Sequence, residues 1–283
     1  MSVYTTTPGA SGFIKLLQST LIAPLGQVSI AAQVSATIQT LAGRVEIPVI
    51  MEDADAGWYV EGAEIASDDP TFVTIPVTPT KLAGITAVSN ETITSGIGNV
   101  ASMALDSLVR DISAKLDAAY FGNLAAPAPR GLASLTSVNE LTTDLATLDV
   151  FEKARIEASK SGEVITAFAT DPETLLALAT AKESTGSNRP LLQPSPVSQS
   201  IATSGDSVSL VVSGIPVFGS PAITPGTIWG IPRRTSVLVI SGDPELATSA
   251  DAGFRNDLTY VRATLRAGFA FTRPGAIQKI TVN

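Results

Sequence analysis

Residues 51–80 read MEDADAGWYVEGAEIASDDPTFVTIPVTPT, and this stretch decides how the rest of the chain is interpreted. Its seven acidic residues, with no basic residue among them, are Glu52, Asp53, Asp55, Glu61, Glu64, Asp68 and Asp69. The alternating segments at 44–50 (RVEIPVI) and 72–77 predict a β-strand on each side, and Asp69-Pro70 marks a turn. The pattern therefore predicts a long two-stranded excursion from the body. A hairpin of this kind is only marginally stable alone and needs a neighbouring surface to lie on.

A long helix is predicted after this excursion and a returning strand at 81–90. Between residues 99 and 120 the apolar residues recur at helical spacing, and Asn99 and Gly122 suit its two ends. Its core-facing residues are predicted to be Leu105, Leu108, Val109, Ile112, Leu116 and Tyr120. At 1.5 Å per residue the helix spans about 33 Å. It is long enough to serve as the backbone of a flat subunit.

The rest of the chain divides around this helix. Residues 1–43 are small and polar and predict an arm that becomes ordered by packing on something else. The Pro-rich link after residue 125 opens an α/β unit, in which Asp171-Pro172-Glu173 starts a helix. A long alternating strand at 258–272 is expected to return to the layer of the long helix. The predicted fold class is α+β with five parts: an arm (1–43), a first body segment (44–50 and 81–125), the excursion (51–80), an α/β unit (126–250) and terminal strands (251–283).

The composition favours an obligate oligomer. Charged residues make up only 16% of the chain, against roughly 25% in typical soluble domains. So few charges leave much apolar surface that other protein must cover. The net charge of −8 argues against a nucleic-acid reader or an anionic membrane surface as partner. The chain has no cysteine and no histidine, and no metal or cofactor site is predicted.

Several groups of residues share the order and spacing of a known family. They are Trp58-Tyr59-Val60-Glu61-Gly62, Ser67-Asp68-Asp69-Pro70-Thr71-Phe72, Lys81-Leu82-Ala83-Gly84, Val88-Ser89-Asn90-Glu91, Pro129-Arg130-Gly131-Leu132, Gly214-Ile215-Pro216-Val217 and Leu265-Arg266-Ala267-Gly268-Phe269. In this order they resemble the major capsid proteins of tailed bacteriophages with the Hong Kong 97-type fold. The resemblance covers residues 44–283, nearly the whole chain.

The resemblance implies a peripheral domain around a spine helix, an axial α/β domain and an extended loop. It implies hexamers and pentamers that form an icosahedral shell around double-stranded DNA, without sequence-specific DNA binding and without membrane contact. It also implies scaffolding, portal and decoration proteins as possible partners, a place in the virion capsid, and assembly in the host cytoplasm. Because the family's loop lies over a neighbouring subunit, we expect the loop acids to contact Arg255, Arg262, Arg266 or Arg273 of that neighbour.

Parts of the sequence are compatible with other functions. An encapsulin-like compartment shell shares the fold and would differ in its contents. A histidine-independent hydrolase is the alternative from another class, but Ser159-Lys160 has no further catalytic group near it in sequence. The Gly96-Ile97-Gly98 turn lacks the βαβ context of a dinucleotide site, and the acids of 52–69 lack the spacing of a calcium loop. Arg233-Arg234 is too small a cluster for a nucleic-acid patch and predicts a local ion-pair site. The predicted protein is therefore structural and not an enzyme.

Overall fold

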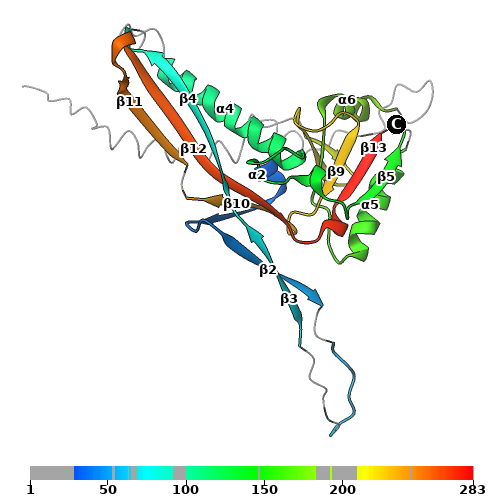
Figure 1. Cartoon of the computed structure of the whole chain (residues 1–283). Helices are drawn as coiled ribbons and strands as arrows, with labels where there is room; N and C mark the ends of the chain where they lie inside the picture. The colour runs from blue at the N-terminus through cyan, green and yellow to red at the C-terminus, as the bar shows by residue number, and fades with distance from the viewer. Residues whose placement is uncertain are drawn as a thin grey trace, which may run out of the picture.

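Two sheets with a long helix and a projecting hairpin make up the protein (Figure 1). The structure is a computed structural model that describes residues 29–52, 55–62, 64, 69–91, 100–145, 147–182, 192, 209–242 and 244–282. Asp53, Asp68 and the glycine turn at 96–98 lie outside the described residues, as do the side chains of Glu52 and Leu105.

The first sheet is organised around one long strand, β12 (Leu258–Phe271). β12 pairs along its C-terminal part with β10 (Ser236–Ser241), and along its N-terminal part with β11 (Glu245–Gly253) on one side and β4 (Thr80–Ser89) on the other. β1 (Ala36–Thr40) adds to β10 in parallel. Alternate residues of β12 are buried, as the sequence predicts, in the order Val261, Ala263, Leu265, Ala267, Phe269 and Phe271.

The predicted spine helix is α4 (Val100–Phe121), which packs on the buried face of this sheet. Leu108, Ile112, Leu116 and Tyr120 are buried there, and Val109 is partly buried against them. The Tyr120 ring meets Phe269 edge to face, with 5.2 Å between the ring centroids. The helical spacing in the sequence therefore identified the core-facing side of α4 correctly.

The second sheet has six strands and carries two helices. Its strand order is β5 (Asn139–Thr143), β13 (Gln278–Val282), β9 (Thr227–Ile231), β6 (Ala167–Thr170), β8 (Ile215–Gly219) and β7 (Ser209–Val212). The helices are α5 (Asp149–Lys160) and α6 (Pro172–Thr180). Single 3-10 turns occupy Leu132–Ser134, Phe254–Asn256 and Pro274–Ala276.

Strand pairing crosses the boundary that the sequence placed at residue 250. β10 precedes this point and β11 runs across it, yet both pair with β12 in the first sheet. β13 follows it, within the predicted terminal segment 251–283, yet it pairs with β5 and β9 in the second sheet. The chain changes sheet after β12, at the 3-10 turn Pro274–Ala276. The chain therefore passes between the two sheets repeatedly, because strand partners far apart in sequence set the grouping.

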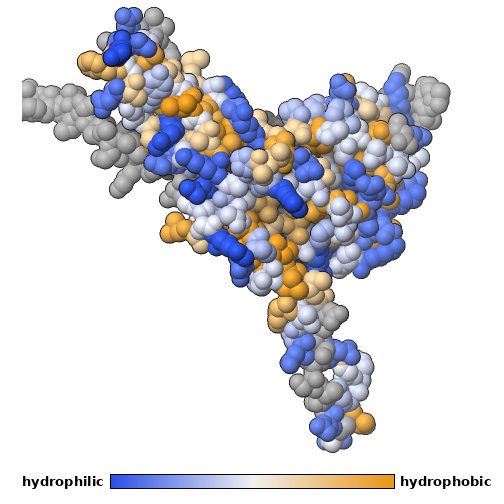
Figure 2. Space-filling model, in the orientation of Figure 1, coloured by the Kyte–Doolittle hydropathy of each residue, from blue (hydrophilic) through white to orange (hydrophobic). Residues whose placement is uncertain are grey.

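The predicted excursion is a twisted hairpin that stands clear of the body (Figures 1 and 2). Its strands β2 (Val45–Glu52) and β3 (Thr71–Val77) pair only with each other. The base of the hairpin is anchored by Ile47 and Val77, which pack against β10 residues. Beyond that base, the described part of the hairpin exposes apolar side chains such as Met51 and Phe72.

Part of the predicted arm packs into its own subunit. The described residues begin with Ser29 and the short helix α2 (Ile30–Val34), which leads into β1. Ile30, Ala31 and Val34 are buried in the main core with α4. The expectation of an arm that orders on something else therefore does not hold for residues 29–40, because this segment has a strand partner and a core contact in its own chain.

The start of α6 confirms a cap that the sequence predicts. The Asp171 carboxylate accepts hydrogen bonds from the backbone N–H groups of Glu173 and Thr174 at 3.1 and 3.0 Å, and from Gly226 N–H at 3.1 Å. Burial alone would raise the pKa of Asp171, but these hydrogen bonds outweigh it and hold the pKa below its usual value. The cap therefore stabilises both α6 and the turn before β9.

We expect Asp171→Ala to lower the free energy of unfolding by about 1–2 kcal/mol, the usual value of a helix N-cap. Since the folded-state pKa is lowered, the stability that Asp171 contributes is present above its unfolded pKa and is lost as pH falls through the folded value. Urea titrations at several pH values would measure both effects. If the free energies of unfolding of wild type and Asp171→Ala differed by a constant amount from neutral pH to below pH 3.8, the expected protonation effect of Asp171 would be contradicted.

Candidate intersubunit interface

The acids of the loop are exposed wherever the structure describes their side chains. Asp55, Glu61, Glu64 and Asp69 all lie on the surface of the projecting hairpin. Gly62 has a positive φ of 84°, a backbone conformation that suits glycine, and the chain turns at Glu61 and Gly62. The hairpin thus presents several carboxylates far from the body of its own chain.

The exposed face of the first sheet carries cations. Arg262 and Arg266 project from β12 on the face opposite α4, because Ala263 and Leu265, which alternate with that face, point into the core. The strand register places Lys81 of β4 directly opposite Arg266. In Figure 2, strongly hydrophilic residues lie over these strands. Like charges directly opposite one another destabilise a sheet, so this pair favours an anion on the same face.

A cavity of about 360 Å³ lies among these side chains. It is lined by Lys81, Arg262 and Arg266 together with Glu245 of β11 and backbone near Leu41 and Gly242. Three cations and one carboxylate leave it with a positive balance. Among the described residues, none of the three cations takes part in a salt bridge. The sequence did not single out Lys81, because only the long-range pairing of β4 with β12 brings it beside Arg266.

The other two predicted arginines lie elsewhere. Arg255 is exposed in the turn that precedes the N-terminal end of β12, whereas Arg266 lies in the C-terminal half of that strand. The eight residue steps from Leu258 to Arg266 alone span about 27 Å. Arg273 already has partners in its own chain: its Nη1 donates to the Ser161 carbonyl oxygen at 3.1 Å and lies 3.8 Å from Glu163 Oε1. The structure therefore brings Arg262 and Arg266 together but not Arg255 or Arg273.

A buried carboxylate on α4 holds the described start of the chain. Asp117 accepts hydrogen bonds from Ser29 Oγ at 2.7 Å, Ile30 N–H at 3.1 Å and Ala31 N–H at 3.0 Å. Burial raises the pKa of Asp117 above its usual value even though these hydrogen bonds act to lower it. The sequence alone predicts no structural role for Asp117. A polar residue inside an otherwise apolar helix stripe was the signal that it has a structural role.

The catalytic alternatives find no support in the described residues. Ser159 Oγ donates to the Arg155 carbonyl oxygen at 2.9 Å, and Lys160 Nζ lies 2.6 Å from Glu157 Oε1, so each is engaged in its own helix. Arg233 Nε donates to the Ser35 carbonyl oxygen at 3.2 Å, a local contact rather than part of a patch. No cluster of potential metal ligands occurs in the described parts of the chain. Among the described helices, none has the length and apolar character needed to cross a membrane.

Comparison with solved structures shows the fold. The capsid of an empty GTA particle, computed with C5 symmetry, matches with a TM-score of 0.69 and 13% identity over 90% of each chain. Gordonia phage Cozz matches with a TM-score of 0.69 and 17% identity over 100% of this chain and 98% of the other. Mycobacterium phage Adephagia matches with a TM-score of 0.69 and 14% identity over 91% of each chain. The expected α+β fold of the Hong Kong 97 type is confirmed.

The family follows from the sequence. No curated protein matches the chain. The Phage capsid family matches residues 15–282, which is almost the entire sequence. This match favours a virion shell protein over a compartment shell and over a hydrolase. The chain belongs to the phage capsid family, as a non-enzymatic major capsid protein of the icosahedral virion shell.

Proposed function

We propose that the acidic loop of each subunit lies on the basic sheet face of the next, and that this contact sets the register of hexamers and pentamers. The basic sheet face means Lys81, Arg262 and Arg266. On this proposal the five-stranded sheet with α4 is the peripheral domain and the six-stranded sheet is the axial domain. The shell encloses double-stranded DNA without reading its sequence, and scaffolding, portal and decoration proteins are its further partners.

One observation carries the proposal: Lys81 and Arg266 are directly opposite on the exposed face. An isolated subunit gains nothing from this placement, since like charges at a cross-strand pair repel. A carboxylate from another copy would relieve that repulsion, and the loop offers Glu61 and Glu64 on an exposed hairpin. Each copy of the chain therefore carries an acidic loop and a basic sheet face, and the charges of the two are complementary between copies.

Assembly itself is tested by sedimentation and electron microscopy of the purified chain. We expect capsomers or closed shells, because an exposed hairpin and a sparsely charged surface favour association. A chain that sediments only as a 29.1 kDa monomer under all assembly conditions would contradict the proposal.

The loop-to-face contact is tested by double-mutant cycles on capsomer dissociation. We expect Glu61→Gln or Glu64→Gln to couple with Arg266→Gln or Arg262→Gln by about 0.2–1 kcal/mol per pair, the range typical of exposed ion pairs. The coupling should weaken as salt rises, since exposed charges are screened. Arg273→Gln is the matched control, because Arg273 is engaged within its own chain. Zero coupling at low salt for Arg262 and Arg266 alike would exclude the contact.

A further inference from the structure

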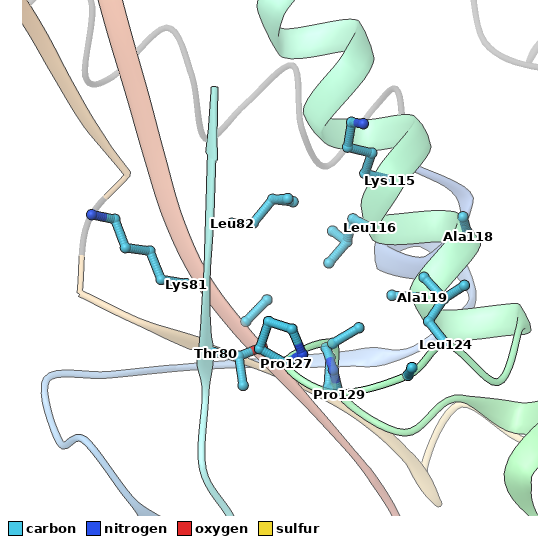
Figure 3. Close-up of a pocket in the computed structure, with 13 residues that line it drawn as sticks. Thr80, Lys81, Leu82, Lys115, Leu116, Ala118, Ala119, Leu124, Pro127 and Pro129 are labelled. Carbon is cyan, nitrogen blue, oxygen red and sulfur yellow. The ribbon is translucent and has the colours of Figure 1, made fainter. Parts of the chain in front are cut away.

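An apolar groove lies beside the basic sheet face. It is a cavity of about 480 Å³ between β4, the C-terminal end of α4 and the Pro-rich link (Figure 3). Leu82 and Leu116 line one part of it, and Leu124, Pro127 and Pro129 line the other. Lysines border it from two elements, Lys81 on β4 and Lys115 on α4. Lys115 has one loose pairing in its own helix, with its Nζ 3.9 Å from Asp111 Oδ2.

The loop carries a large apolar side chain without cover. Trp58 is fully exposed, at 105% of its reference area, and Val60 is 82% exposed. Between them, Tyr59 is turned back over Gly57, where an added Cβ would lie 3.2 Å from the Tyr59 ring. Trp58 therefore points away from its own hairpin. An indole in water is the kind of side chain that most often anchors a protein interface.

We propose that Trp58 of one subunit inserts into the apolar groove of a neighbouring copy. The proposal rests on the function proposed above and names its anchor. An indole fits within the groove's volume, and its apolar walls would remove it from water. The acids on either side of Trp58, Asp55 and Glu61, would then lie near the groove's two lysines.

Three features indicate that the groove is occupied by the loop of a second copy of the chain and not by the chain's own loop. The hairpin projects from the body, so the loop tip stands away from the groove of its own chain (Figure 1). Lys81 borders both the groove and the basic cavity, so a loop lying along the basic face continues directly into the groove. The charges are complementary, because residues 51–80 contain no base and the groove's border contains no acid.

Engineered disulfides test the contact directly, since the chain contains no cysteine. The pair Trp58→Cys and Leu124→Cys should form crosslinked multimers in assembled particles under mild oxidation. The control pair is Trp58→Cys with Leu176→Cys, because Leu176 is equally a well-exposed leucine but lies on α6 outside the groove. Multimers from the first pair only are expected, whereas no multimers, or equal amounts from both pairs, would overturn the proposal.

Tryptophan fluorescence tests whether Trp58 becomes buried on assembly of the wild-type chain. The chain has two tryptophans, and Trp229 is buried, so the difference between wild type and Trp58→Phe reports on Trp58. On assembly, this difference signal should shift to shorter wavelength and lose its quenching by acrylamide. Shells that form with Trp58 still fully quenched would overturn the insertion and leave the shell function intact; failure to form shells would instead contradict the proposed function.

Substitution measures how much Trp58 contributes to the affinity between subunits. Trp58→Ala should weaken capsomer association by about 30-fold, the effect of a typical interface anchor. Val60→Ala, in the same loop and also exposed, should have a clearly smaller effect. Equal effects of the two substitutions would show that Trp58 is not the anchor.

Discussion

Ile112→Asp is expected to abolish folding of the subunit. Ile112 lies in the middle of α4 with 4% of its surface exposed, packed on the first sheet. An aspartate there would place a carboxylate in an apolar site without a partner, which costs several kcal/mol even after partial relaxation. That loss is comparable to the roughly 5–15 kcal/mol by which a typical domain is stable. Leu108→Asp should act in the same way, because Leu108 packs against the backbone of Gly84 in β4.

The matched control is Ala114→Asp, which puts the same new side chain on the exposed side of the same helix. It should change the free energy of unfolding by less than about 1 kcal/mol, since only helix propensity is affected. Soluble expression and thermal unfolding monitored by circular dichroism would compare the three chains. An Ile112→Asp protein that melts at the wild-type temperature would show that this side of α4 is not core.

Local patterns in the sequence were enough to predict the parts of the fold that depend on one segment. The spacing of Leu108, Ile112 and Leu116 shows the buried side of α4, because a helix presents one side to the core whatever that core is made of. The alternation in 258–271 identified the residues of β12 that face α4 for the same reason, but not Ala270, which is buried on the other face against the base of the hairpin. The hairpin at 45–77 followed from two alternating strands and the acidic connection between them.

Long-range pairing could not be predicted from such patterns. The placement of β13 in the second sheet depends on its partners β5 and β9, which are far away in the sequence. The same is true of β1, in which Ala36 pairs with Val237 of β10, 201 positions later. At the candidate interface, the family resemblance predicted Arg262 and Arg266 as contacts, whereas the position of Lys81 opposite Arg266 depends on the register between β4 and β12.

Asp117→Ala is expected to release the described start of the chain from α4. The Asp117 carboxylate satisfies Ser29 Oγ and the first two N–H groups of α2, all of them buried. Each buried donor left without a partner costs about 1–3 kcal/mol, so the segment should undock and expose these groups to water rather than stay. Undocking would also open the β1–β10 ladder, in which Ile38 pairs with Val239. Asp111→Ala is the control, since the Asp111 side chain is exposed on the same helix with only a 3.9 Å contact to Lys115.

Limited proteolysis and pH titration together test this role of Asp117. Cleavage between residues 29 and 43 should be much faster in Asp117→Ala than in wild type or Asp111→Ala, and equal rates would show that the hydrogen bonds do not hold the segment.

Because burial raises the folded-state pKa of Asp117, the folded protein binds this proton more tightly than the unfolded chain does. The resulting stability is fully present below the unfolded pKa and is lost as pH rises through the folded value. The stability of wild type relative to Asp117→Asn, which cannot titrate, should therefore fall as pH rises from 3.8 toward neutral. A pH-independent difference between these two proteins would mean that folding leaves the pKa of Asp117 unchanged.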